Sequence, residues 1–161
     1  MEKYILFAEV HDTPGVVSRV SGFFTRRGYN IESFVTSKTE RREITLLTFV
    51  VQSTPEEIKL LVHQLKRIED IISVFNASET SAVTREFMLV KINCPQEKNL
   101  EIMQVCQMLD VKILGREKDA VTVEAVGSTQ KLDDIALIFE QYGIKKIVRS
   151  GPVCVAQVKE D

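Results

Sequence analysis

Apolar residues follow two alternating spacings along the chain, the two-residue period of a strand and the 3.6-residue period of a helix. In the first half, short apolar runs that predict strands alternate with longer segments that predict amphipathic helices. The strands are expected at residues 4–10, 31–38, 44–52 and 71–75, and the helices at residues 14–27 and 55–68. This order, β-α-β-β-α-β, is that of a ferredoxin-like fold.

The same pattern begins again after residues 77–84, which are small and polar and lack an apolar period. This segment is therefore expected to be a linker between two domains. In the second half, strands are expected at residues 86–93, 111–114, 120–126, 144–148 and 153–158, and helices at residues 100–109 and 129–142. The chain is thus predicted to be an α+β protein with two tandem ferredoxin-like (βαββαβ) domains, residues 1–76 and 85–161.

The start of the first helix has an unusual composition. Thr13 is expected to be the N-cap and Pro14 the first helical residue, where a missing N–H costs nothing. Gly28 supplies the left-handed residue that ends the helix. Gly15, in the first turn, would let a ligand approach N–H groups that have no intrahelical partner. Such a helix end binds a carboxylate or phosphate, although an ordinary capped helix explains the same pattern.

Asp12, Gly15 and Asn30 are the candidate ligand site, because the loop after the first strand and the start of the second are expected at one end of the sheet. The N–H groups of Gly15 and Val16 could hold a carboxylate, Asp12 could accept a hydrogen bond from an α-ammonium group, and Asn30 offers a donor and an acceptor. An α-amino acid carries this pair of charges on one carbon. In the alternative interpretation Asp12 and Asn30 are turn residues.

Composition limits the remaining possibilities. The chain has 161 residues, 44% hydrophobic and 27% charged, as in soluble globular proteins. A formal net charge of −2 gives no attraction to nucleic acid or to an acidic membrane, and no leader or membrane-spanning segment is expected. Cys94, Cys106 and Cys154 are far apart in the sequence and are expected to be reduced core thiols of a cytoplasmic protein.

No motif for catalysis stands out. His11 and His63 lie in different predicted elements and share no ligand spacing with the cysteines, so no metal site is expected. The sequence contains no phosphate-binding glycine loop, nucleophile elbow or zinc-protease motif. An enzyme on a ferredoxin-like scaffold would need a cluster of titratable residues, which the sequence does not show. We therefore expect no catalytic residues in this chain.

Four sequence blocks resemble a known family. Residues 14–20, Pro-Gly-Val-Val-Ser-Arg-Val, and residues 27–33, Arg-Gly-Tyr-Asn-Ile-Glu-Ser, resemble the opening of the small regulatory subunits of acetolactate synthase, whose first domain is an amino-acid-sensing ACT domain. Residues 85–92 and 149–151 match later blocks of the same family. The resemblance implies that the effector-binding residues are Asp12, Pro14, Gly15, Val16, Val17, Asn30 and Ile31.

The resemblance also implies a function. Members of this family form homodimers through their ACT sheets, activate a catalytic (large) subunit of acetolactate synthase, a transferase, and confer feedback inhibition by a branched-chain amino acid such as valine. Thiamine diphosphate, magnesium and FAD would belong to that partner, and no cofactor is expected in this chain. A free-standing amino-acid-sensing ACT protein acting on a different enzyme is the alternative. The chain departs from the family at Asp12, where many relatives have asparagine, in residues 108–114, and at Pro152.

Overall fold

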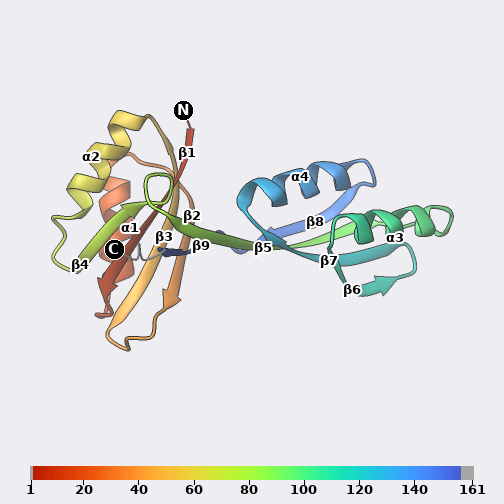
Figure 1. The fold of residues 1–161 in the computed structure, drawn as a ribbon, viewed down its shortest axis with the longest axis horizontal. Coiled ribbons are helices and arrows are strands. Elements are labelled where there is room, and N and C mark those ends of the chain that lie inside the picture. The colour runs from red at the N-terminus through yellow and green to blue at the C-terminus, as the bar shows by residue number, and fades with distance from the viewer. Residues whose placement is uncertain (1, 157–161) are drawn as a thin grey trace. The chain divides into compact units, whose positions relative to one another are not determined.

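The structure is a computed structural model and describes residues 2–156. Within this range the chain forms two compact units (Figure 1). The first contains residues 2–84 and 151–156, and the second contains residues 85–150. Both are α+β units in which strands and helices follow the β-α-β-β-α-β order, which confirms the predicted fold class.

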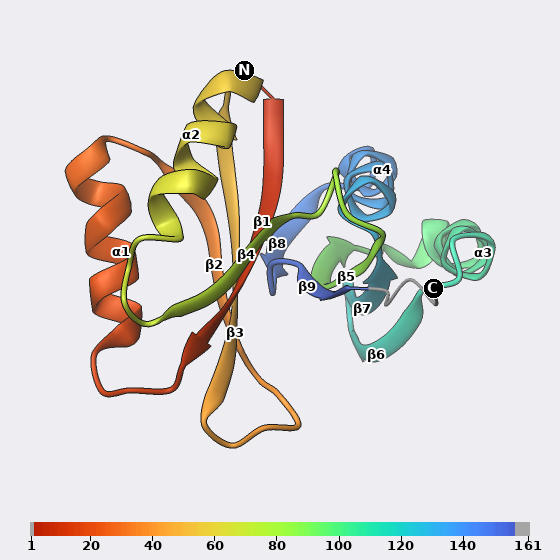
Figure 2. The ribbon, with the colours of Figure 1, turned by 60° about the vertical axis from the view of Figure 1, so that its left-hand side comes forward.

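The first unit is a four-stranded antiparallel sheet with two helices on one face (Figure 2). Its elements are β1 Glu2–His11, α1 Val16–Arg27, β2 Ile31–Lys38, β3 Ile44–Ser53, α2 Pro55–Leu65 and β4 Ile71–Asn76. The strand order is β2-β3-β1-β4, so β2 and β4 are the edges. Alternate residues of β1 and β3 face the helices and form the core, with Leu6, Phe24, Phe49 and Leu61 completely buried.

The two helices of this unit begin differently. At α2, Thr54 and Glu57 form the capping box that the sequence indicates, and the hydrogen bond from Ser53 helps to lower the pKa of the Glu57 carboxyl. At α1 the prediction that Thr13 is the N-cap and Pro14 the first helical residue is wrong, because the helix begins at Val16. Gly15 is the N-cap, with a left-handed φ of 83°, and no side chain caps this helix end. Gly28 ends α1 with a φ of 73°, as predicted.

The second unit repeats this arrangement with its own core. Its elements are β5 Ala82–Asn93, a 3₁₀ turn Gln96–Lys98 (η1), α3 Asn99–Met108, β6 Lys112–Glu117, β7 Ala120–Gly127, α4 Thr129–Glu140 and β8 Ile144–Arg149. The strands lie in the order β6-β7-β5-β8, and Ser128 caps α4 through the N–H of Lys131. Completely buried side chains between the sheet and the two helices come from both layers: Met88 and Ile92 from β5, Ile102 from α3, and Leu132 and Phe139 from α4.

The observed units differ from the expected domain boundaries at two places. Strand β5 begins at Ala82, inside the segment expected to be a linker. Residues 151–156, expected in the second domain, belong to the first unit. They include β9 Val153–Ala156, which pairs with β5, so an edge strand is present where the sequence predicts one, and residues 157–158 of that prediction lie outside the described residues.

Residues 151–154 pack on the face of the first sheet that the helices leave open. Gly151 lies so close to β2 that an added Cβ would be 2.1 Å from Ser33 Oγ and 2.8 Å from Val35 Cγ2. Cys154 is buried beside the hydroxyl of Thr48 on β3, and burial raises the pKa of its thiol to about 11. All three cysteines are buried and free, as expected.

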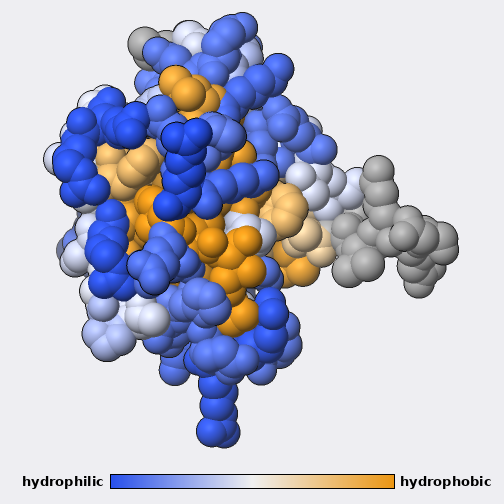
Figure 3. Space-filling model, turned by 90° about the vertical axis from the view of Figure 1, so that its left-hand side faces the viewer, coloured by the Kyte–Doolittle hydropathy of each residue, from blue (hydrophilic) through white to orange (hydrophobic). Residues whose placement is uncertain are grey.

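Some apolar side chains of the first unit remain at the surface. Val17 on α1, Leu60 on α2 and Ile72 and Phe75 on β4 are at least 40% exposed. Phe75 stacks on Phe7, on the face of the sheet opposite the helices, so these four side chains do not form a single patch. A space-filling view shows apolar residues gathered in the middle of one face, with hydrophilic residues around them (Figure 3). Such a patch is typical of a surface that contacts another molecule.

We predict that Gly151→Ala destabilises the first unit by about 1–3 kcal/mol, because alanine at a φ of +78° is strained and its Cβ would overlap Ser33. Urea unfolding followed by circular dichroism measures the change. Gly115→Ala is the matched control, since a Cβ there meets no atom within 4 Å, and it is expected to change stability by less than about 0.5 kcal/mol. Equal stability of both variants would contradict the packing described for residue 151.

Candidate functional site

The candidate site is the β1–α1 loop, residues 12–15. Two backbone hydrogen bonds fix the start of this loop to its neighbours. The N–H of His11 donates to the carbonyl of Asp70 at 2.9 Å, and the N–H of Asp12 donates to the carbonyl of Glu43 at 2.8 Å. These acceptors lie just before β4 and β3, so the loop is tied to two other connections at its end of the sheet.

Arg19 holds the rest of the loop in place. Its guanidinium donates to both carboxylate oxygens of Asp70, at 2.7 and 2.9 Å. It also donates to the hydroxyl of Thr13 at 2.7 Å and to the carbonyl of Pro14 at 3.0 Å. The hydroxyl of Thr13 in turn donates to Asp70 at 2.8 Å. The hydrogen bonds from Arg19 and Thr13 lower the pKa of the Asp70 carboxyl.

Sequence reasoning missed Arg19 and Asp70. The available signal was the spacing, because Arg19 lies four residues after Gly15 and helical side chains lean toward the N-terminus of their helix. An arginine one turn into a helix that begins with glycine can therefore reach back over the empty first turn. No comparable signal pointed to Asp70, which comes from a connection 51 residues later.

The free donors at the start of α1 differ from those predicted. The N–H of Val16 donates to the carbonyl of Thr13 at 3.1 Å, and the side chain of Val16 is buried in the core. The first helical hydrogen bond joins the N–H of Arg19 to the carbonyl of Gly15. Within residues 2–156, the N–H groups of Gly15, Val17 and Ser18 have no protein acceptor. Together with the helix dipole, these three donors form an anion-binding end.

Nothing on α1 already neutralises this end. Its first turn contains no acidic side chain, and no side chain caps it. Asp12, the first residue of the loop, is exposed, and its carboxylate could accept a hydrogen bond from an ammonium group. The loop can therefore hold a molecule that carries an anion and a cation close together.

Asn30 and Ile31 do not lie beside this loop, and the expectation that they do was wrong. Ile31, the first residue of β2, pairs with Val51, which pairs with Tyr4 near the start of β1. The loop follows His11 at the far end of β1, about 23 Å away at 3.3 Å per residue. The reason is topological, because α1 carries the chain back along the sheet before β2 begins. The end of β2 at Lys38, rather than its start, lies near the loop.

The second unit contains a buried ion pair that links its two terminal strands. Arg149 at the end of β8 donates to both oxygens of Glu86 near the start of β5, at 2.8 and 2.9 Å, and Glu86 is 5% exposed. Arg149 also contacts Asp133, and Thr129 donates to Glu86 at 3.1 Å. These carboxylates raise the pKa of Arg149. The sequence blocks 85–92 and 149–151 are thus partners in space.

Two classes of site are not found in the described chain. Among residues 2–156, no three side chains of the types His, Cys, Asp and Glu come close enough to hold a metal ion. The same residues include no helix that is both long and apolar enough to cross a membrane.

The βαββαβ order and the four-stranded antiparallel sheet with both helices on one face define the first unit as a ferredoxin-like domain. Comparison with family models agrees with this class. Residues 6–73 match the AHAS small subunit-like ACT domain, and residues 85–158 match the small subunit of acetolactate synthase. The chain belongs to the acetolactate synthase small-subunit family.

Individual relatives cover nearly the whole chain. A probable acetolactate synthase small subunit of Archaeoglobus fulgidus is 32% identical over 155 residues, which are 96% of this chain and 97% of the relative. The acetolactate synthase small subunit of Mycolicibacterium smegmatis is 31% identical over 92% of this chain and 87% of its own. The crystal structure of the acetolactate synthase small subunit from Thermotoga maritima has the same fold, with a TM-score of 0.83 over 99% of both chains and 24% identity.

We predict that Asp70→Asn lowers the stability of the first unit at neutral pH and removes part of its loss in acid. The hydrogen bonds from Arg19 and Thr13 hold the pKa of the Asp70 carboxyl below its ordinary value. The ionised carboxylate therefore stabilises the folded state above that ordinary pKa, and this contribution is lost as the pH falls through the lowered pKa. Urea unfolding midpoints at neutral and acid pH measure both effects.

Asp12→Asn is the matched control, since Asp12 is an exposed carboxylate of the same loop and its side chain forms no hydrogen bond or ion pair within the described residues. It is expected to leave the unfolding midpoint nearly unchanged. If Asp70→Asn and Asp12→Asn have the same urea unfolding midpoint at neutral pH, the Arg19–Asp70 ion pair does not stabilise the loop as described.

Proposed function

We propose that this chain is the regulatory subunit of acetolactate synthase. In this proposal it binds the catalytic (large) subunit, raises its rate and makes it sensitive to a branched-chain amino acid such as valine. Membership of the small-subunit family over both units supports the proposal. The observation that carries the regulatory part is the start of α1, where three N–H donors have no acceptor among the described residues and Arg19 fixes the loop through Asp70 and Pro14.

The effector would bind to this loop by its charged groups. Its carboxylate would accept hydrogen bonds from the N–H groups of Gly15, Val17 and Ser18, at the positive end of the helix dipole. Its ammonium group would donate to Asp12. Pro14 shapes the turn, and the exposed side chain of Val17 offers an apolar contact for a branched side chain. Val16 contributes through its position in the core rather than through a free N–H.

Asn30 and Ile31 would reach the effector from a second copy of the chain. Strand β2 is an edge of the sheet, so its outer backbone groups are available for another strand. If two copies pair β2 to β2 in antiparallel orientation, the start of β2 in one copy lies beside the end of β2 in the other. Asn30 of the second copy then lies at the end where the β1–α1 loop of the first is found.

The chemistry of the reaction would belong to the partner. We propose that thiamine diphosphate, magnesium and FAD are bound by the catalytic subunit, and that this chain holds no cofactor and supplies no catalytic residue. The exposed apolar side chains of the first unit are available for contact with such a partner or with a second copy. We further propose that the protein works in the cytoplasm.

The direct test measures acetolactate formation by the catalytic subunit with and without this chain, and then with added valine. We expect the chain to raise the rate, to turn over no pyruvate alone, and to confer inhibition by valine, leucine or isoleucine. Gly15→Asp should keep the activation and weaken inhibition about tenfold or more, because a carboxylate at the helix end repels that of the effector.

Gly15→Asn is the matched control for this variant. Asparagine has nearly the same size as aspartate, and both residues tolerate the left-handed backbone of residue 15. Asparagine differs in carrying no charge. Gly15→Asn should therefore keep more of the inhibition than Gly15→Asp. If the parent chain leaves the rate of acetolactate formation by the catalytic subunit unchanged, the regulatory-subunit proposal is rejected in favour of a sensor for another enzyme. If the catalytic subunit is still fully inhibited when Gly15→Asp replaces the parent chain, the proposed effector site is rejected.

A further inference from the structure

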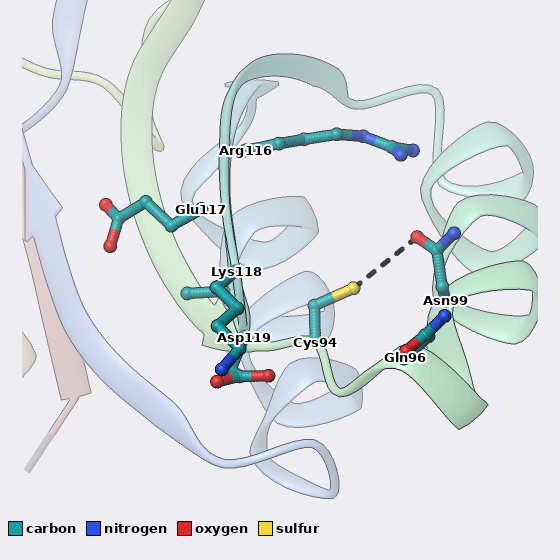
Figure 4. Close-up of a pocket in the computed structure, with 8 residues that line it drawn as sticks. Cys94, Gln96, Asn99, Arg116, Glu117, Lys118 and Asp119 are labelled. Atoms are coloured by element: carbon teal, nitrogen blue, oxygen red, sulfur yellow. Dashed lines mark hydrogen bonds between the residues drawn. The ribbon is translucent and has the colours of Figure 1, made fainter.

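The second unit has a pocket that none of the roles discussed above uses. It lies where β5 ends and α3 begins, and its volume is about 230 Å³ (Figure 4). Cys94, Gln96 and Asn99 line it from the connection between β5 and α3. Arg116, Lys118 and Asp119 line it from the hairpin between β6 and β7. All of these residues belong to the second unit.

The pocket occupies the place in the second unit that the β1–α1 loop has in the first. After β1, the N–H groups of His11 and Asp12 donate to the carbonyls of Asp70 and Glu43. After β5, the N–H groups of Asn93 and Cys94 donate to the carbonyls of Gly143 and Asp119, both at 3.0 Å.

In both units the donors are the last residue of the first strand and the residue after it. The acceptors come directly before the fourth and the third strand of the unit, respectively. This repeated pair of hydrogen bonds places Cys94 where the first unit has Asp12. The connection from 94 to 99 therefore corresponds to the loop that precedes α1.

The charged residues that line the pocket are two cations, Arg116 and Lys118, and two carboxylates, Glu117 and Asp119. Arg116 extends from β6 toward α3, on the side where Asn99 lies (Figure 4). Its described polar contact is with the sulfur of Met103, and within residues 2–156 neither Arg116 nor Lys118 forms an ion pair with a carboxylate. Glu117 also lines the pocket, but its side chain extends away from Cys94 and Asn99 (Figure 4) and pairs with Lys91, which lowers the pKa of the Glu117 carboxyl.

An acidic side chain and two amide side chains line the same pocket. Asp119 supplies a carboxylate, and Gln96 and Asn99 supply amides. The thiol of Cys94 lies 3.7 Å from the side-chain oxygen of Asn99, which leaves the amide N–H groups of Asn99 available to a ligand. The pocket thus combines two cations that form no ion pair among residues 2–156, the carboxylate of Asp119, a second carboxylate already paired with Lys91, and the amides of Gln96 and Asn99.

We propose that this pocket binds a free α-amino acid, with its carboxylate on Arg116 and Lys118 and its ammonium group on Asp119. A cavity volume of about 230 Å³ leaves room for a ligand the size of an amino acid. This second site does not depend on the β1–α1 loop or on the catalytic partner. It would let the second unit respond to an amino acid independently of the first.

The test is a titration of the full chain, labelled with ¹⁵N, with proteinogenic α-amino acids added singly at millimolar concentration. At least one is expected to shift the backbone N–H signals of residues 96–99 and 118–120. Valine is compared with 2-oxoisovalerate, its 2-oxo acid, and with acetate, a simple carboxylate. Any other amino acid that binds is compared with its own 2-oxo acid in the same titration. Because the 2-oxo acid lacks the ammonium group, it is expected to bind about tenfold or more weakly than the amino acid.

Variants separate this site from the one in the first unit. The double variant Arg116→Gln, Lys118→Gln should lose the shifts in the second unit, with affinity lowered about tenfold or more. Lys112→Gln is the matched control, because Lys112 is an exposed cation on the same strand that does not line the pocket. Gly15→Asp should keep the shifts of the second unit whatever happens at the first.

Three results would overturn the proposal. One is that no amino acid shifts these signals in the parent chain, and another is that the shifts persist in the double variant. The third is that acetate produces the same shifts at the same concentrations, since the pocket would then bind a simple anion only. None of these results depends on whether the chain activates a catalytic subunit, so the two proposals can fail separately.

Discussion

A helix that follows a strand carries the chain back to the end of the sheet at which that strand began, and this constraint governs the candidate site. In the first unit it places the β1–α1 loop and the start of β2 at opposite ends of the domain. The seven residues that the family resemblance indicates therefore cannot meet around one ligand within a single chain. They can meet only if a second copy supplies Asn30 and Ile31, and the free edge of β2 offers the surface for that pairing.

The loop itself depends on polar contacts rather than on a cap. Because no side chain caps α1, its first N–H groups remain available, and Arg19 and Asp70 hold the loop from both sides of the turn. The first unit uses this arrangement to keep a helix end unneutralised. The second unit repeats the two backbone hydrogen bonds but places Cys94 and a short 3₁₀ turn where the first has Asp12 and Gly15. A common backbone plan thus carries different chemistry in the two halves.

Much of this architecture could be predicted from the sequence, because strand and helix periods are local properties. The order of elements, the capping box of α2 and the glycine that ends α1 all follow from a few neighbouring residues. The N-cap of α1 was assigned to Thr13, yet the hydroxyl of that residue bonds to Asp70 instead, through a contact that spans 57 positions. The pairing of Glu86 with Arg149 and the return of residues 151–156 to the first unit also depend on long-range contacts, which no local pattern encodes.

The most direct test of the account is the binding of valine by mixed dimers in which one chain carries Gly15→Asp and the other carries Asn30→Ala. If each site combines the loop of one chain with Asn30 of the other, one site of the mixed dimer carries both substitutions and the other site is intact. Calorimetry should then show one functional site for each mixed dimer, although dimers of either variant alone bind weakly or not at all. Absence of binding by the mixed dimers, or parental binding by Asn30→Ala alone, would contradict a site shared between two copies.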